Sequence, residues 1–135
     1  MLKVYSTILV TLFSGIVFSQ DVQFEFRNDD RPSFDQLITV SQLSEKQGQK
    51  NLILLDVRLK KDFEKDPLLI PGASYFDPEK FPEWSESLPS DSEVVVYCVA
   101  GKWVSQKVAY LLNEQGINVS ILAGGIEDWK KSNEQ

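Results

Sequence analysis

Two uninterrupted apolar segments constrain the fold of this 135-residue chain more than any other feature. They are NLILLDV at residues 51–57 and EVVVYC at residues 93–98, and polar residues bound each of them. Continuous apolar runs of this length are typical of strands that are buried on both faces of a sheet. Other elements must cover both faces of such a sheet, and this favours a parallel sheet between layers of helices.

Helical patterns separate the strands. Thr39 and Gln42 have the spacing of a capping box, which predicts the start of a short helix that ends before Gly48. We expect further helices over 58–66, from about 102 to Gly116 and over 126–131, further strands in 70–76 and 118–122, and a loop with one helical turn over 77–92. Strands that alternate with helices through short connections predict an α/β fold with a doubly wound parallel sheet and helices on both faces. Sites in such folds form at the carboxyl ends of the strands.

The first 19 residues have a different composition from the rest. Lys3 precedes a nearly uncharged run at residues 4–18, and the small residues Val17 and Ser19 precede a cleavage position. We interpret residues 1–19 as a signal peptide cleaved near Ser19. An uncleaved anchor is disfavoured because the run is shorter than the roughly 20 residues that span a bilayer. We therefore expect export, preferably to the periplasm, and no stable membrane association after cleavage.

One domain is expected after the signal peptide. Residues 20–35 are charged and interrupted by Pro32, so they form either a leader that packs on the domain or a loose linker. The domain itself is expected over residues 36–133. The chain has 14 basic against 20 acidic residues and no block of basic residues, which argues against nucleic-acid binding. No spacing of acidic residues suggests a metal site, so no metal is expected.

Cys98 is the only cysteine, and the chain has no histidine to act as its base. From the residues alone, Cys98 is either a small buried side chain or a reactive thiol. An ordinary thiol, with a pKa of about 8.5, is only about 3% ionised at pH 7. Three sources of positive potential converge on this position: the backbone N–H groups of the following loop, the N-terminus of the next helix, and Lys102. Gly101 suits such a loop because one residue is expected to need a positive φ.

Three segments resemble the signatures of the rhodanese-like domain, in the same order. They are LLDVRLKKDF…IPGASYF at 54–76, VVVYCVAGKWVS at 94–105 and ILAGGIEDWK at 121–130. The loop CVAGKWVSQ is most similar to that of single-domain members. The resemblance spans roughly residues 36–132. It implies a five-stranded parallel sheet and a sulfurtransferase of the thiosulfate sulfurtransferase type, with a covalent persulfide on Cys98 and no other cofactor.

The resemblance also implies roles for the loop. The loop residues would bind a small anionic sulfur donor, either thiosulfate or a persulfide. They would also bind a thiophilic acceptor such as cyanide or a small or protein thiol. These loop residues are Val99, Ala100, Gly101, Lys102, Trp103, Val104 and Ser105. Lys102 would steer the donor, and Ser105 would bond the sulfur or cap the helix. Trp103 would either line an acceptor site or close the pocket. Asp56 and Arg58 would support the site, as a structural ion pair or as a source of positive potential.

Related proteins with this fold that act on phosphate carry an arginine six positions after the cysteine. Here position 104 is Val, and a phosphate would lack its bidentate clamp, so we do not expect a phosphatase. Two hypotheses besides sulfur transfer stay open. One is a non-catalytic binding module that keeps the fold, and the second is a thiol redox sensor that forms a mixed disulfide through Cys98.

Overall fold

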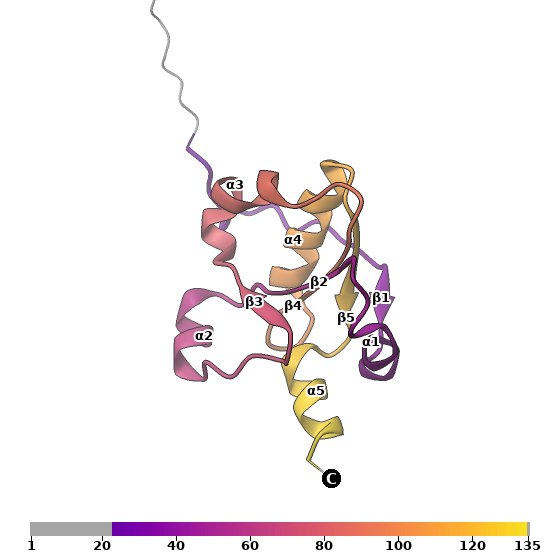
Figure 1. The fold of residues 1–135 in the computed structure, drawn as a ribbon. Coiled ribbons are helices and arrows are strands. Elements are labelled where there is room, and N and C mark those ends of the chain that lie inside the picture. Colours follow the sequence, from indigo (N-terminus) through magenta and orange to yellow (C-terminus); the bar gives the residue numbers. More distant parts are fainter. Residues whose placement is uncertain (1–22, 135) are drawn as a thin grey trace, which may run out of the picture.

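The computed structural model describes residues 23–134, so the predicted signal peptide and its cleavage position near Ser19 lie outside the described residues. Strands and helices alternate along the chain (Figure 1). The strands are β1 (Leu37–Ile38), β2 (Leu52–Asp56), β3 (Ala73–Tyr75), β4 (Glu93–Tyr97) and β5 (Asn118–Leu122). The helices are α1 (Val40–Lys46), α2 (Lys60–Lys65), α3 (Phe81–Trp84), α4 (Trp103–Glu114) and α5 (Gly125–Ser132), with the short 3-10 turns η2 (Pro78–Lys80) and η3 (Ser85–Ser87). Within this part of the chain, no helix is long and apolar enough to cross a membrane.

The five strands form one parallel sheet in the order β1-β5-β4-β2-β3. β4 is the central strand and pairs along its length with β2, with Leu55 opposite Val96. This arrangement confirms the predicted α/β fold with a doubly wound parallel sheet. Because β4 is central, the residue that follows it, Cys98, lies at the middle of the carboxyl edge of the sheet, where sites form in such folds.

Each face of the sheet carries its own apolar core. On one face, α3 and α4 cover the sheet through Trp84, Val104 and Val108, and Cys98 belongs to this cluster. On the other face, α1 and α5 cover it through Leu43 and Ile126. The uninterrupted apolar runs of β2 and β4 are therefore explained, since successive side chains enter opposite cores.

Most predicted elements are confirmed. The helix expected over 58–66 is shorter in the structure, where α2 is Lys60–Lys65, and three further elements differ. The capping box of α1 is present: the Gln42 backbone N–H donates to Thr39 Oγ1 at 3.1 Å, and the Thr39 N–H donates to Gln42 Oε1 at 2.8 Å. Residues 77–92 contain α3 and two 3-10 turns, which is more helix than the single turn predicted. β1 was not predicted from the residue pattern because a two-residue strand shows no periodicity. α5 begins at Gly125, one residue before the predicted start.

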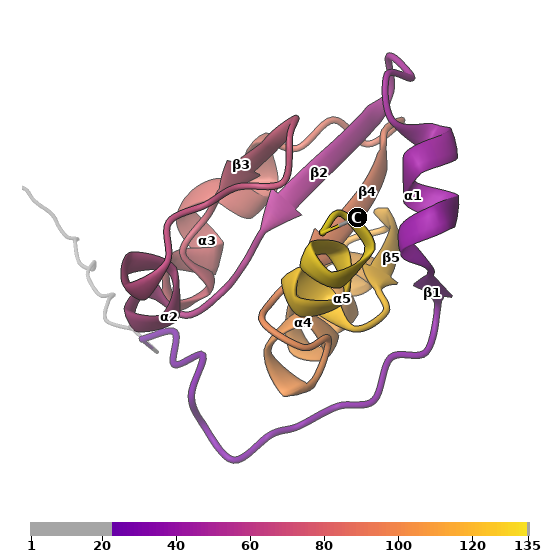
Figure 2. The same cartoon turned by 90° about the horizontal axis from the view of Figure 1, so that it is seen from below.

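The residues before β1, which we call the N-terminal strap (residues 23–36), pack on the domain. Figure 1 shows the strap starting beside α3, and Figure 2 shows it passing around α4 to β1. Phe26 in the strap is 2% exposed, and the ring of Phe24 stacks on Phe81 of α3 with centroids 6.0 Å apart. Arg27 forms an ion pair with Glu79 at 2.6 Å. Residues 20–35 were expected to form either a leader that packs on the domain or a loose linker. The described part of this segment is a packed leader.

Candidate functional site

Cys98 is held between the central strand and the start of α5. The Val57 backbone N–H donates to the carbonyl of Tyr97 at 2.8 Å, which fixes the end of β4. The carbonyl of Cys98 accepts from the Ile126 N–H at 3.0 Å, and that of Val99 accepts from the Glu127 N–H at 3.1 Å. The N–H groups of the first helical turn have no partner within their helix, so α5 uses two of them to hold the loop.

Two glycines allow the loop to contact the turn between β5 and α5. Gly101 has a φ of +75°, so the prediction of a positive φ at this position is confirmed. A Cβ atom on Gly101 would lie 3.0 Å from the Gly124 nitrogen. Gly125, with a φ of +61°, is closer still, because a Cβ atom there would lie 2.5 Å from the carbonyl oxygens of Cys98 and Val99. Both positions therefore require glycine for space as well as for conformation.

The loop after Cys98 carries a row of free donors. In the described part of the chain, none of the backbone N–H groups from Val99 to Ser105 donates to a protein acceptor. Backbone donors in folded proteins are normally paired with protein or solvent. These groups are thus available to a ligand, which is what a loop that binds an anion requires.

The side chain of Ser105 contacts the sulfur. Cys98 Sγ lies 3.2 Å from Ser105 Oγ, and the Ser105 hydroxyl donates to the carbonyl of Lys102 at 3.3 Å. Ser105 is fully buried, and Cys98 is 5% exposed. Ser105 therefore bonds the sulfur, which was one of the two roles expected for it. A hydroxyl can rotate, so the same group can accept from a thiol and donate to a thiolate.

Trp103 has a partner that the sequence did not suggest. Its ring packs against Phe26 of the strap with centroids 5.6 Å apart, and the guanidinium carbon of Arg31 lies 4.0 Å from its ring centroid. Trp103 is half-buried in this contact. The expectation that it lines an acceptor site or closes the pocket did not include this contact with the strap.

Lys107 is a buried cation next to the same strap. Its side chain is 3% exposed, and Nζ donates to the carbonyl of Phe26 and to Asn28 Oδ1, both at 2.5 Å. Burial lowers the pKa of Lys107, the positive charge of Arg31 lowers it further, and Asp30 opposes this effect. In the described part of the chain, no carboxylate forms a salt bridge with Lys107.

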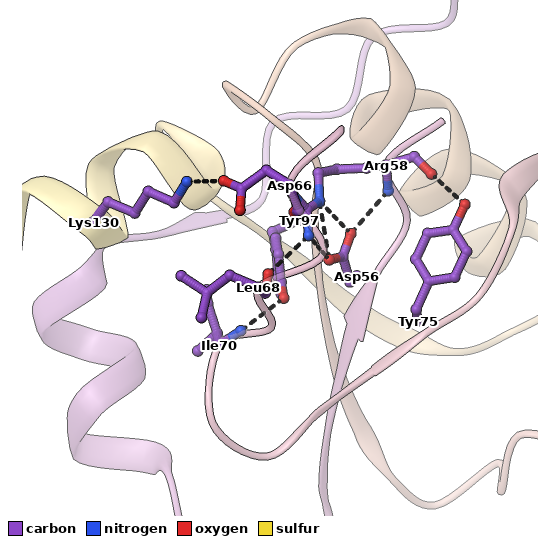
Figure 3. Close-up of polar contacts among 8 residues, drawn as sticks. All are labelled: Asp56, Arg58, Asp66, Leu68, Ile70, Tyr75, Tyr97 and Lys130. Atoms are coloured by element: carbon purple, nitrogen blue, oxygen red, sulfur yellow. Dashed lines mark hydrogen bonds and ion pairs between the residues drawn. The ribbon is translucent and has the colours of Figure 1, made fainter. Parts of the chain in front are cut away.

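Asp56 and Arg58 form a buried network, drawn in Figure 3. Arg58 Nε donates to both carboxylate oxygens of Asp56 at 3.0 Å, and Nη2 donates to Oδ2 at 2.6 Å. The guanidinium also donates to the carbonyls of Asp66 and Leu68, each at 2.9 Å. Burial lowers the pKa of Arg58, but the hydrogen bonds and charge of Asp56 outweigh it, so the pKa is raised. This geometry is that of a structural ion pair that fixes the chain after β2.

The same network borders the loop. Arg58 and Val99 line a cleft of about 190 Å³, whose other walls are α2 and the start of α5. Asp66 and Lys130 form an ion pair across it, and the hydrogen bond from Lys130 lowers the pKa of Asp66 (Figure 3). Arg58 is thus near the loop, but Asp56 neutralises its charge. Among residues 23–134, no group of three or more His, Cys, Asp or Glu side chains is arranged to hold a metal ion.

Comparison with known proteins identifies the family. The family model described as the rhodanese-like domain matches residues 39–132. The chain belongs to this family. Two relatives are named as sulfurtransferases. Thiosulfate sulfurtransferase GlpE of Coxiella burnetii is 36% identical over 83 residues, which cover 61% of this chain and 75% of the relative. Putative sulfurtransferase YtwF of Bacillus subtilis is 34% identical over 94 residues, covering 69% and 88%.

Solved structures support the rhodanese-like fold. A rhodanese-related protein from Thermoplasma volcanium matches with a TM-score of 0.63 and 23% identity, over 74% of this chain and 95% of that one. A rhodanese-like domain protein from Staphylococcus aureus matches with a TM-score of 0.61 and 25% identity, over 70% and 90%. The five-stranded sheet that the resemblance implied is therefore confirmed by topology and by these neighbours.

The sequence located the rhodanese-like loop and allowed a packed leader, but it did not predict that this leader contacts the loop. Cys98, Ser105 and the glycines lie together as expected, and Asp56 and Arg58 lie one strand away. Arg31 and Lys107 were not predicted as neighbours of the loop, although both lie near Trp103. Lys107 lies three residues after Val104 and directly before Val108, on the apolar face of α4, so helical spacing was the signal that could have indicated its burial. Its contact with the strap is tertiary and leaves no such signal.

Proposed function

We propose that this chain is a sulfurtransferase that carries sulfane sulfur on Cys98. The observation that supports this most is the loop itself. The thiol at the end of the central strand lies 3.2 Å from the Ser105 hydroxyl, and the seven backbone N–H groups that follow it have no acceptor within residues 23–134. The chain belongs to the rhodanese-like family, and two of its relatives are named as sulfurtransferases. Sulfur transfer is therefore the chemistry that best fits this arrangement.

The proposed reaction has two half-reactions. The Cys98 thiolate attacks the outer sulfur of thiosulfate, the S–S bond of the donor breaks, and sulfite leaves with the bonding electron pair. The product is a persulfide anion on Cys98. An acceptor, either cyanide or a thiolate, then attacks the outer sulfur of this persulfide, forming thiocyanate or a new persulfide and restoring the Cys98 thiolate. Each half-reaction leaves a stable form of the protein, so ping-pong kinetics are expected.

The loop residues have distinct tasks in this proposal. The free N–H groups of residues 99–105 bind the outer sulfur anion, and Ser105 donates its hydroxyl to the inner sulfur. Lys102 is exposed and, within the described residues, has no carboxylate partner, so it steers the anionic donor. Low exposure of Cys98 shields the persulfide from water. An exported location, expected from residues 1–19, is also part of the proposal.

A steady-state assay tests the proposal. The chain is supplied with thiosulfate and cyanide, and thiocyanate is measured by its iron complex, with Cys98→Ser as the matched variant. We expect turnover in the native chain and none above background in Cys98→Ser. Turnover that persists in Cys98→Ser would overturn the role of Cys98. No turnover in either protein would overturn the assignment and favour the non-catalytic binding module.

A further inference from the structure

Arg31 connects the strap to the loop that follows Cys98. Its guanidinium carbon lies 4.0 Å from the ring centroid of Trp103. Trp103 is the first residue of α4 and directly follows Lys102, so it belongs to the loop. The contact places a cation of the strap beside the loop, although the two residues are far apart in the sequence. A guanidinium that stacks on an aromatic face keeps its edge free for hydrogen bonds.

The donors of Arg31 are only partly used. Nη1 donates to the carbonyls of Asn28 and Asp30, which fixes the orientation of the guanidinium. Within residues 23–134, Nε and Nη2 have no acceptor, and Arg31 forms no salt bridge. Arg27, four residues earlier on the same strap, differs because Glu79 accepts from its Nε and Nη2. Arg31 therefore presents a free pair of N–H donors, the geometry that suits an oxyanion.

The charge around Trp103 is unbalanced. Arg31 and Lys102 are exposed, Lys107 is buried, and in the described residues none of the three forms a salt bridge. Arg31 lowers the pKa of Lys107, so the two cations act on each other, with Asp30 as the opposing charge. The chain as a whole has a net charge of −6. A local group of cations in an acidic protein attracts anionic ligands to that place.

We propose that Arg31, in addition to the steering by Lys102, selects anionic sulfur donors by binding the oxyanion end of the donor while its sulfur meets Cys98. This inference rests on the proposed function, in which Cys98 receives sulfur from such a donor. The strap supplies the guanidinium of Arg31, and the ring of Trp103 holds this guanidinium in place. A donor without negative charge gains nothing from this contact, so Arg31 affects the choice of donor and leaves the chemistry at the sulfur unchanged.

Alkylation of Cys98 measures this selection without any sulfur transfer. Second-order rates are determined with iodoacetate, which is anionic, and with iodoacetamide, which is neutral and of similar size. We expect Arg31→Gln to lower the ratio of the iodoacetate rate to the iodoacetamide rate by about threefold to tenfold, the range for removing one partly screened charge. Arg31→Lys is expected to restore part of the ratio because it keeps the charge.

Arg27→Gln is the matched control, because Arg27 lies on the same strap but is paired with Glu79. It is expected to leave the ratio unchanged. An equal fall in both variants would mean that loosening of the strap causes the effect, and it would overturn the inference. An unchanged ratio in Arg31→Gln, or no labelling of Cys98 by either reagent, would overturn it as well.

Steady-state kinetics separate this inference from the proposed function. In Arg31→Gln, the KM for thiosulfate is expected to rise by a similar factor with kcat nearly unchanged, which is the signature of lost binding. If thiosulfate transfers sulfur to Cys98 equally well in Arg31→Gln and the native chain, the inference fails and the function stands. If the native chain takes no sulfur while the alkylation ratio behaves as expected, the proposed function fails and the site is an anion-selective thiol.

Discussion

Gly125 lies so close to Cys98 that a Cβ atom on it would sit 2.5 Å from the Cys98 carbonyl oxygen. The same atom would lie 2.5 Å from the carbonyl oxygen of Val99. These two carbonyls accept the hydrogen bonds from the first turn of α5. The start of α5 and the loop after Cys98 therefore form one unit, and the shape of the loop depends on the absence of a side chain at position 125.

Gly125→Ala is expected to displace the loop. The new Cβ meets backbone atoms that cannot rotate away, and the φ of +61° adds strain, so we expect a loss of about 3 kcal/mol or more in the free energy of unfolding. Chemical denaturation measures this free energy. The rate of sulfur transfer is expected to fall in the same variant because the loop is displaced. Gly48→Ala is the control, because Gly48 has a φ of +93° but nothing within 4 Å of its Cβ position. Equal losses in the two variants would show that close contact is unimportant.

Removing one partner of the Asp56–Arg58 pair is expected to destabilise the fold strongly. Asp56 is 0% exposed and Arg58 is 2% exposed, so either single substitution leaves a buried charge without its partner. We expect Asp56→Ala to cost about 3–5 kcal/mol in the free energy of unfolding. The double variant Asp56→Ala, Arg58→Met is expected to be more stable than Asp56→Ala alone. The single variant Arg58→Met completes the double-mutant cycle. If the losses of the two single variants simply add up in the double variant, the structural role assigned to the pair is contradicted.

Ser105→Ala is expected to slow sulfur transfer with little loss of stability. A hydrogen bond to a charged group contributes about 1.5–3 kcal/mol, which corresponds to about a tenfold to hundredfold fall in kcat/KM. The assay is thiocyanate formation from thiosulfate and cyanide. Ser120→Ala is the control, since Ser120 is a buried serine on β5 whose hydroxyl contacts Gln36 instead of Cys98. A transfer rate that is the same in both variants would exclude Ser105 from the reaction.

Lys107 predicts a pH dependence of stability. Burial holds its pKa in the folded chain below the usual 10.5, so between the lowered value and 10.5 the unfolded chain binds more protons than the folded chain. The free energy of unfolding must therefore rise with pH in that window. Lys107→Met lacks this contribution, so the native chain should gain stability relative to it as the pH approaches 10.5. Urea unfolding at several pH values measures the difference, and a constant difference would contradict the burial of a charged lysine.

The residue pattern predicted the sheet because its strands carry long apolar runs. β2 and β4 face two cores, so nearly every position is apolar, and α4 shows its buried side through Val104 and Val108. β1 could not be predicted in this way. Its two residues are held by backbone pairing with β5, which leaves no periodic trace in the sequence.

The site was predicted where its residues are neighbours in the sequence, or where they lie at the end of the adjacent strand β2, as Asp56 and Arg58 do. Cys98, Gly101 and Ser105 lie within one loop, and their contacts follow from local geometry. The contact between Lys107 and Phe26 joins residues 81 positions apart, and Arg31 reaches Trp103 in the same way. No pattern within a window of the sequence reveals such contacts, because they depend on the path of the strap around α4.

The most direct test of the central claim follows the sulfur itself. The chain is incubated with thiosulfate labelled in its outer sulfur, and the Cys98 peptide is analysed by mass spectrometry before and after cyanide is added. We expect one labelled sulfur atom on Cys98, which cyanide removes as labelled thiocyanate. A Cys98 peptide that gains no sulfur, while thiosulfate is at saturating concentration, would contradict the account.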